Sequence, residues 1–231
     1  MLERRLEPEV MDTSEDAHDY DTMDHRAVNR VFVDDFLSFV RANGFDDRLA
    51  NLRQPLRLLD VGTGTALIPI ELCSRRGSCQ IIAIDLAAEM LHLADRNIAK
   101  AGFASSIQTE RIDAKQMPYA TGSFEAVISN SIVHHIPEPK AVFAEMARVL
   151  QHGGPLFVRD LLRPESLADV DQLVATYAGR ENAHSQQLFR DSLHAALTLD
   201  EVRDIAVAHS IPVTSVAQTS DRHWTLAWSS G

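Results

Sequence analysis

The sequence predicts an α/β fold in which helices cover both faces of a mostly parallel, seven-stranded sheet. Two patterns support this prediction. Between residues 56 and 161, short apolar segments alternate with amphipathic segments at the period of βαβ units. The first apolar segment also runs into a Gly-Thr-Gly turn and then into a helix, which is typical of α/β folds that bind ligands at the carboxyl edge of the sheet.

Each expected strand in this region is short and apolar, and each expected helix carries apolar residues three or four positions apart. Glycines follow the expected helices, where they act as stop signals. The expected strands are 56–61, 81–85, 107–112, 124–129 and 156–161, and the expected helices are 66–75, 87–98 and 142–150.

The regions before and after this alternation of strands and helices have different patterns. Residues 1–24 are polar and acidic and are expected to be loosely ordered or conditionally ordered, whereas 28–40 have helical spacing. After residue 161 come three amphipathic helices and then two closing strands that form an antiparallel pair. These helices are expected at 167–177, 188–197 and 198–206, and the strands at 212–218 and 224–228. We therefore expect an N-terminal segment and helix over 1–54 and a main domain over 55–231, with a helical insertion at about 163–197.

The composition is that of a globular protein with an acidic balance. The 231 residues are 45% hydrophobic and include 22 Lys and Arg against 33 Asp and Glu, a formal net charge of −11. A phosphate backbone or an anionic membrane surface is repelled by such a charge, so neither is an expected partner. Cys73 and Cys79 are expected to be buried free thiols. With no apolar leader or spanning segment in view, a cytoplasmic location is expected.

Three acidic residues lie at the carboxyl ends of the first three strands, at the edge where the glycine turn lies. Asp60 ends the first strand, two residues before Gly62-Thr63-Gly64, Asp85 ends the second strand, and Asp113 lies at the end of the third. Glycines let a ligand approach the backbone, and the start of the next helix offers free amides. A carboxylate at the position of Asp85 can accept hydrogen bonds from both hydroxyls of a ribose.

The order and spacing of these motifs resemble the class I S-adenosylmethionine-dependent methyltransferases, in particular the UbiE-like small-molecule branch, over about residues 55–162. The resemblance implies a Rossmann-like methyltransferase fold and S-adenosylmethionine as cofactor, with S-adenosylhomocysteine as product. It implies that the glycine turn contacts the methionine part, that Asp85 binds the ribose, and that the adenine lies against the residues after the second and third strands. The implied cofactor-binding residues are Asp60, Gly62, Thr63, Gly64, Asp85, Leu86, Asp113, Ala114, Asn130 and Tyr20.

The sequence departs from the family pattern at Ala66, where a third glycine is common. A nicotinamide dinucleotide fold is the alternative interpretation of the turn, but its third glycine position is Leu67 here. The NAD(P)-dependent oxidoreductase therefore stays the second hypothesis. A non-catalytic cofactor-binding protein with the same fold is a third, and the intact acidic and glycine set argues against it.

The acceptor side carries fewer signals. His134 and His135 follow the fourth strand, where they either line the acceptor pocket or act as a base, with neither histidine preferred. Tyr20 and Met23 either form part of a lid over the cofactor or belong to a solvated tail. No catalytic metal is expected, because the acidic pattern of metal-dependent catechol methyltransferases is missing around Asn130. The expected function is methyl transfer to a small molecule by in-line displacement, with the acceptor and the oligomeric state open.

Overall fold

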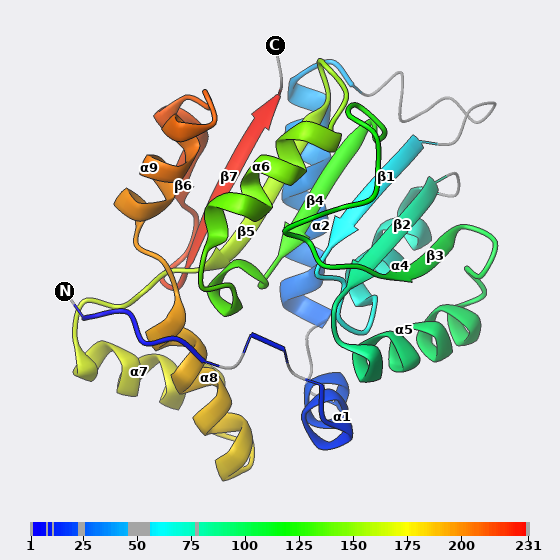
Figure 1. Ribbon diagram of the computed structural model, residues 1–231. Coiled ribbons are helices and arrows are strands. Elements are labelled where there is room, and N and C mark those ends of the chain that lie inside the picture. Colours follow the sequence, from blue (N-terminus) through cyan, green and yellow to red (C-terminus); the bar gives the residue numbers. More distant parts are fainter. Residues whose placement is uncertain are drawn as a thin grey trace.

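A computed structural model describes residues 2–7, 9–10, 12–22, 26–45, 56–76 and 79–229 of the protein. One seven-stranded sheet lies at the centre, with helices on both faces (Figure 1). The strand order is β3-β2-β1-β4-β5-β7-β6, which confirms the expected fold class. The strands are β1 (Leu56–Val61), β2 (Cys79–Asp85), β3 (Ile107–Arg111), β4 (Ala126–Asn130), β5 (Pro155–Leu161), β6 (Val216–Gln218) and β7 (His223–Ser229).

Strands β1 to β5 are parallel, and their apolar sequences follow from burial on both faces. Every residue of β5 is buried. Successive residues of β1 face opposite sides: Leu58 belongs to one core cluster and Leu59 to the other. Because the five strands run in the same direction, their carboxyl ends meet at one edge, and this edge carries the candidate site.

Two helical layers cover the sheet. On one face lie α2 (Arg26–Ala42), α4 (Leu67–Arg76) and α5 (Ala88–Ala101), and on the other lie α6 (Pro139–Val149) and α9 (Leu199–Ala208). Aromatic side chains pack between α2 and the sheet on the first face. The ring of Phe32 contacts the ring of Phe157 of β5 edge-on, at a centroid distance of 5.2 Å. The helix α2 covers the expected span 28–40 and extends it at both ends.

The closing strands pair as expected, with β7 antiparallel to β5 and to β6. The expected strand over 212–218 is too long, because 213–215 form the short 3₁₀ helix η2 (Val213–Ser215). There the amide of Ser215 donates to the carbonyl of Pro212, so the backbone turns before Val216 pairs with Leu226. The fourth strand is also shorter than expected, since Phe124 forms only an isolated bridge with Leu150.

In the N-terminal segment, expected to be loosely or conditionally ordered, Ser14–Thr22 form the helix α1, which the sequence did not predict. Its buried Ala17 packs against Ala87 and Met90 at the start of α5. Tertiary packing thus orders a stretch whose own composition is polar and acidic. Met23 lies outside the described residues.

The helical insertion consists of α7 (Leu167–Tyr177) and α8 (Ala183–Ala195), which lie below the carboxyl edge of the sheet in Figure 1. Leu173 and Leu193 pack against Leu161, the last residue of β5. Residues 2–7 and 9–10 run past α8 toward α1, and the amide of Arg5 donates to the carbonyl of His194.

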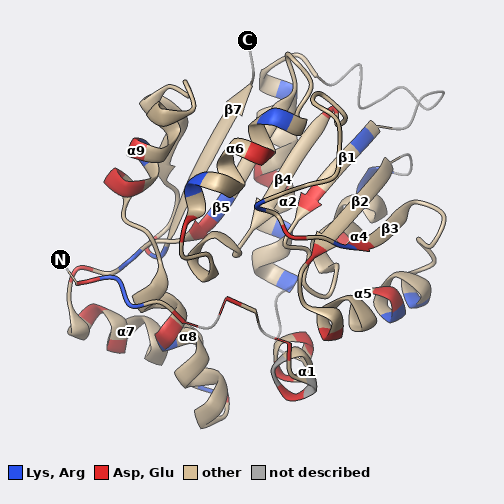
Figure 2. Ribbon diagram, viewed as in Figure 1, with Lys and Arg blue, Asp and Glu red and all other residues tan. Residues whose placement is uncertain are grey.

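Acidic residues line α1, α7 and α9, whereas α5 and α6 carry acidic and basic residues side by side (Figure 2). In the described part of the chain, no helix is long and apolar enough to cross a membrane.

Candidate functional site

The glycine turn is fastened to the end of β2 by backbone hydrogen bonds. The amides of Gly62 and Thr63 both donate to the carbonyl of Ile84 at 2.9 Å, and the amide of Gly64 donates to Asp85 Oδ2 at 2.8 Å. Gly62 has a φ of 74°, and a Cβ atom there would lie 2.4 Å from Ile132 Cδ1. The turn therefore requires glycine at position 62 both for its backbone conformation and for space.

Ala66 also adopts a left-handed conformation, with a φ of 63°, at a fully buried position. This is the position where the family pattern often has a third glycine. The departure noted in the sequence thus places an alanine in a conformation that costs about 1–2 kcal/mol for a residue with a Cβ atom.

A cavity lies beside this turn, and we call it the turn cavity. Eight of the ten expected cofactor-binding residues line it: Tyr20, Gly62, Gly64, Asp85, Leu86, Asp113, Ala114 and Asn130. The other two, Asp60 and Thr63, line a smaller neighbouring cavity that shares Gly62, Tyr20 and Asn130 with it. The tertiary structure thus brings the ends of β1, β2 and β4 and the loop after β3 to one place.

Two buried carboxyl groups, those of Asp60 and Asp85, lie beside the glycine turn, and burial disfavours the ionised form of each. Burial raises the pKa of Asp60 to about 7, and the charge of Asp85 adds to this shift. Burial also raises the pKa of Asp85, although the amides of Ala87 and Gly64 oppose that shift by donating to its carboxylate. A ligand that carries positive charge stabilises the ionised form of such neighbouring carboxyl groups, so the site favours a cationic ligand.

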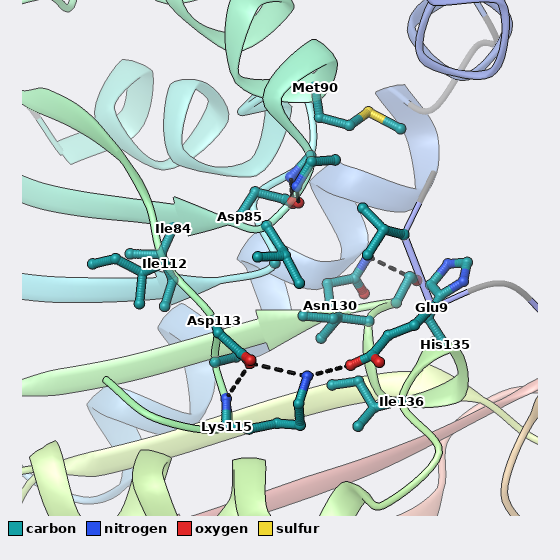
Figure 3. A pocket seen from close by; sticks show the side chains of 18 of the residues that line it. Glu9, Ile84, Asp85, Met90, Ile112, Asp113, Lys115, Asn130, His135 and Ile136 are labelled. Atoms are coloured by element: carbon teal, nitrogen blue, oxygen red, sulfur yellow. Dashed lines mark hydrogen bonds and ion pairs between the residues drawn. The ribbon is translucent and has the colours of Figure 1, made fainter. Parts of the chain in front are cut away.

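Two residues at the turn cavity were missed by the sequence analysis. Figure 3 shows Lys115 between the carboxylates of Asp113 and Glu9, within hydrogen-bonding reach of both. Burial raises the pKa of Asp113, but the backbone amide and the ammonium group of Lys115 outweigh it and lower that pKa below its usual value. Lys115, two residues after Asp113, could have been suspected; nothing in the sequence pointed to Glu9.

A second cavity, of about 770 Å³, lies between the sheet edge and the helical insertion, and we call it the helix cavity. Its volume is within the range of small-molecule sites. Two aromatic residues of the insertion, Tyr177 and Phe189, line it. The helix cavity and the turn cavity share four lining residues, Tyr20, Asn130, Ser131 and His135, so the two cavities adjoin along one wall.

The two expected histidines have different surroundings, although both belong to the 3₁₀ helix η1 (Val133–His135). His134 is buried, and its Nδ1 lies 2.5 Å from Asp160 Oδ1. Burial lowers the pKa of His134, but the carboxylate of Asp160 outweighs burial and raises it. His135 lines both cavities, and its Nδ1 lies 3.0 Å from Glu7 Oε1.

Hydrogen bonds hold residues 2–7 against η1 and so bring Glu7 close to the histidines. The guanidinium of Arg4 donates to the carbonyls of Ala195, Ile136 and His134 at 2.7, 2.9 and 3.2 Å. The sequence analysis missed both Arg4 and Glu7, because no local pattern connects the N-terminal segment with residues after β4.

Comparisons with known proteins agree with this geometry. Residues 59–158 match a family model described as "Methyltransferase domain". The chain is 34% identical over 143 residues to a ubiquinone biosynthesis O-methyltransferase of Xanthomonas oryzae, covering 61% of this chain and 57% of that protein. It is 32% identical over 192 residues to a malonyl-[acyl-carrier protein] O-methyltransferase of Geobacter sulfurreducens, covering 81% and 63%. The matches thus span a little under two thirds, at most, of these curated relatives.

Solved structures share the fold. An S-adenosylmethionine-dependent methyltransferase from Aquifex aeolicus superposes with a TM-score of 0.59 at 17% identity, over 82% of this chain and 89% of that one. A candidate methyltransferase of the same cofactor class from Methanococcus maripaludis gives a TM-score of 0.61 at 16% identity, over 96% of both chains. At such identities the likeness concerns the fold alone.

Proposed function

Because the chain carries a class I S-adenosylmethionine-dependent methyltransferase domain, we propose that it transfers the methyl group of S-adenosylmethionine to a small-molecule acceptor. The donor binds in the turn cavity and the acceptor in the helix cavity. The observation that carries this proposal is the wall common to the two cavities, formed by Tyr20, Asn130, Ser131 and His135. A methyl group can pass from one cavity to the other only where they adjoin.

The residues of the turn cavity fit the parts of this cofactor. The carboxylate of Asp85 accepts hydrogen bonds from the ribose hydroxyls, and Asp113 and Ala114 contact the edge of the adenine. The buried carboxylate of Asp60 lies next to the glycine turn that receives the methionine part. The cofactor is cationic at its sulfonium and its ammonium, so the carboxyl groups of Asp60 and Asp85 favour it.

The cofactor supplies an activated methyl group, so the chain has to position the acceptor and exclude water rather than provide strong acid or base catalysis. A lone pair of the acceptor atom attacks the methyl carbon in line with the carbon–sulfur bond. That bond breaks with its electron pair going to sulfur, which leaves S-adenosylhomocysteine. We assign to His134 and His135 the task of holding the acceptor at the common wall, since both line the helix cavity.

The N-terminal part, residues 1–54, serves in this proposal as a lid over the cofactor. Tyr20 of α1 lines the cavities on both sides of the common wall, and a Cβ atom on Gly64 would lie 3.6 Å from its ring. Helix α1 rests on α5 through Ala17, a small contact that can open and close. The main domain, 55–231, then supplies the sheet edge and the helical insertion.

We further propose a cytoplasmic location and a small-molecule partner instead of nucleic acid or membrane. The free, buried Cys73 and Cys79 support a reducing compartment. The excess of 33 acidic over 22 basic residues supports an acceptor without a phosphate backbone.

Calorimetric titration with S-adenosylhomocysteine, with NADH in parallel, tests the donor site. We expect micromolar binding of S-adenosylhomocysteine and none of NADH. Binding of NADH alone would overturn the proposal. Such a result is not expected from the sheet, because the antiparallel β7 inserted between β5 and β6 differs from the six-stranded order of dinucleotide-binding folds.

A further inference from the structure

Three side chains with metal-ligating atoms converge at His135, which is part of the wall between the two cavities. Glu7 Oε1 lies 3.0 Å from His135 Nδ1 and 3.6 Å from His134 Nε2. Their side chains are 9%, 16% and 4% exposed, respectively. The methyl-transfer proposal explains why histidines face the acceptor, but it gives no reason for a buried carboxylate from the N-terminal segment to join them.

The contact between Glu7 and His135 differs from an ordinary hydrogen-bonded ion pair. Both Glu7 Oε1 and His135 Nδ1 are buried, and neither meets hydrogen-bond geometry with any group in the described ranges of the chain. Buried polar atoms nearly always have a hydrogen-bond partner. Glu7, His134 and His135 each place one atom that can carry a lone pair within 4.8 Å of the others, and a bound cation would supply the partner that Glu7 Oε1 and His135 Nδ1 lack.

We propose that Glu7, His134 and His135 form a binding site for a divalent transition-metal ion of the zinc type. Such ions bind nitrogen and oxygen at about 2.0–2.2 Å, so the ligand atoms of a tetrahedral site lie ~3.3–3.6 Å apart. The observed separations of 3.0 and 3.6 Å are close to this range. All three ligand atoms lie within 4.8 Å of one another. Two imidazoles and one carboxylate are a donor set that such ions favour.

Asp160 supplies the outer support that metal-binding histidines have as a rule. Its Oδ1 lies 2.5 Å from His134 Nδ1, and its Oδ2 accepts from the amide of Val133 at 2.5 Å. A hydrogen bond from Nδ1–H to this carboxylate leaves the lone pair of His134 on Nε2, the atom that faces Glu7. The charges of Glu7 and Asp160 together balance those of a divalent ion.

The role of the ion rests on the proposed function. Three protein ligands leave a fourth position, and His134 and His135 both border the helix cavity, so this position is available to the acceptor. An acceptor hydroxyl bound there releases its proton to bulk water more readily, since the ion stabilises the resulting oxyanion. That oxygen then attacks the methyl carbon, and the carbon–sulfur electron pair goes to sulfur. The acceptor class is therefore a hydroxyl compound, either a phenol or an alcohol.

The test is metal binding by the full chain, freed of metal by chelation and titrated with Co²⁺. We expect one equivalent to produce the visible absorption of a cobalt ion with nitrogen ligands, and Zn²⁺ to displace it. The Glu7→Gln and His135→Gln variants should bind at least tenfold more weakly. Glu9→Gln is the matched control on the same segment, because Glu9 bonds to Lys115 and not to the histidines. His209→Gln, on the exposed end of α9, controls for histidine count.

Binding that is lost in Glu7→Gln and His135→Gln but kept in both controls would establish the site. Absence of stoichiometric binding, or equal binding by Glu7→Gln and the parent chain, would overturn it and leave Glu7 as an ion-pair partner of the histidines. Titration of the same metal-free samples with S-adenosylhomocysteine separates this result from the proposed function. Glu7 does not line the turn cavity, whereas His135 does. Cofactor binding should therefore persist in Glu7→Gln, the variant that separates loss of the metal site from failure of the proposed function.

Discussion

The carboxylate of Asp85 accepts a hydrogen bond of 2.8 Å from the backbone amide of Gly64, which joins the end of β2 to the glycine turn. Its other oxygen accepts from the amide of Ala87 at 3.0 Å. These two bonds hold the carboxylate at the opening of the turn cavity, where the ribose of the cofactor is proposed to bind.

The Asp85→Ala variant should therefore bind S-adenosylhomocysteine more weakly, by about 1–3 kcal/mol, because it loses hydrogen bonds made to a charged group. Calorimetric titration measures this change. Asp95→Ala is the control, since Asp95 lies on α5 and bonds to Thr109 away from the cavity. Equal affinities of Asp85→Ala and the parent chain would contradict the assignment.

Gly62 and Gly102 both have positive φ angles, of 74° and 81°, but only Gly62 lacks room for a side chain. Substitution by alanine should cost about 1–2 kcal/mol at either position because of the backbone conformation. Gly62→Ala should lose about 1–3 kcal/mol more, because its Cβ meets Ile132. Urea denaturation of the two variants gives the difference directly, and equal losses would show that the turn tolerates a side chain.

The stability of the parent chain should depend on pH through Asp60. Burial raises the pKa of this carboxyl to about 7 in the folded protein, above its value of 3.8 in an unconstrained chain. The folded state thus binds a proton more tightly, and the free energy of unfolding should fall as pH rises from about 4 to 7. The loss amounts to a few kcal/mol, at 1.36 kcal/mol for each unit of difference.

The Asp60→Asn variant has no proton to lose and should be the more stable of the two chains at pH 8. At pH 4 the two should be similar, since a protonated aspartate resembles asparagine. Denaturation at a series of pH values measures this crossover. Parallel curves for the two chains would mean that Asp60 titrates far below neutral pH.

If α1 closes over the cofactor, bound S-adenosylhomocysteine should protect it from proteolysis. A glutamate-specific protease cleaves after Glu15, which is exposed in α1. We expect severalfold slower cleavage there with the ligand present, while cleavage after the exposed Glu165 at the insertion keeps its rate. Identical digestion at Glu15 with and without ligand would argue against a lid.

The cofactor side of the site could be predicted from the sequence because its signals are local. Asp60, the glycine turn and Asp85 each follow a strand with a clear apolar pattern, and parallel strands bring their carboxyl ends to one edge. The elements that the sequence predicted less well are short segments. Helix α1 was missed because its own residues are polar, and its order depends on the contact of Ala17 with α5.

The different surroundings of the two histidines could not be predicted from the sequence. No pattern in the sequence distinguishes His134 from His135, because the two residues are adjacent and chemically identical. The fold separates them: β5 places Asp160 beside His134, while the N-terminal segment places Glu7 beside His135.

The alternation of strands and helices, the glycine turn and the acidic residues at the strand ends could all be predicted from the sequence. They depend on apolar periodicity and backbone freedom, which act over a few neighbouring residues. The contact of Glu7 with two histidines and the adjoining of the turn and helix cavities at Tyr20 are visible only in the folded chain. Such contacts join segments far apart in the chain, and their formation depends on the packing of whole elements, which no local pattern encodes.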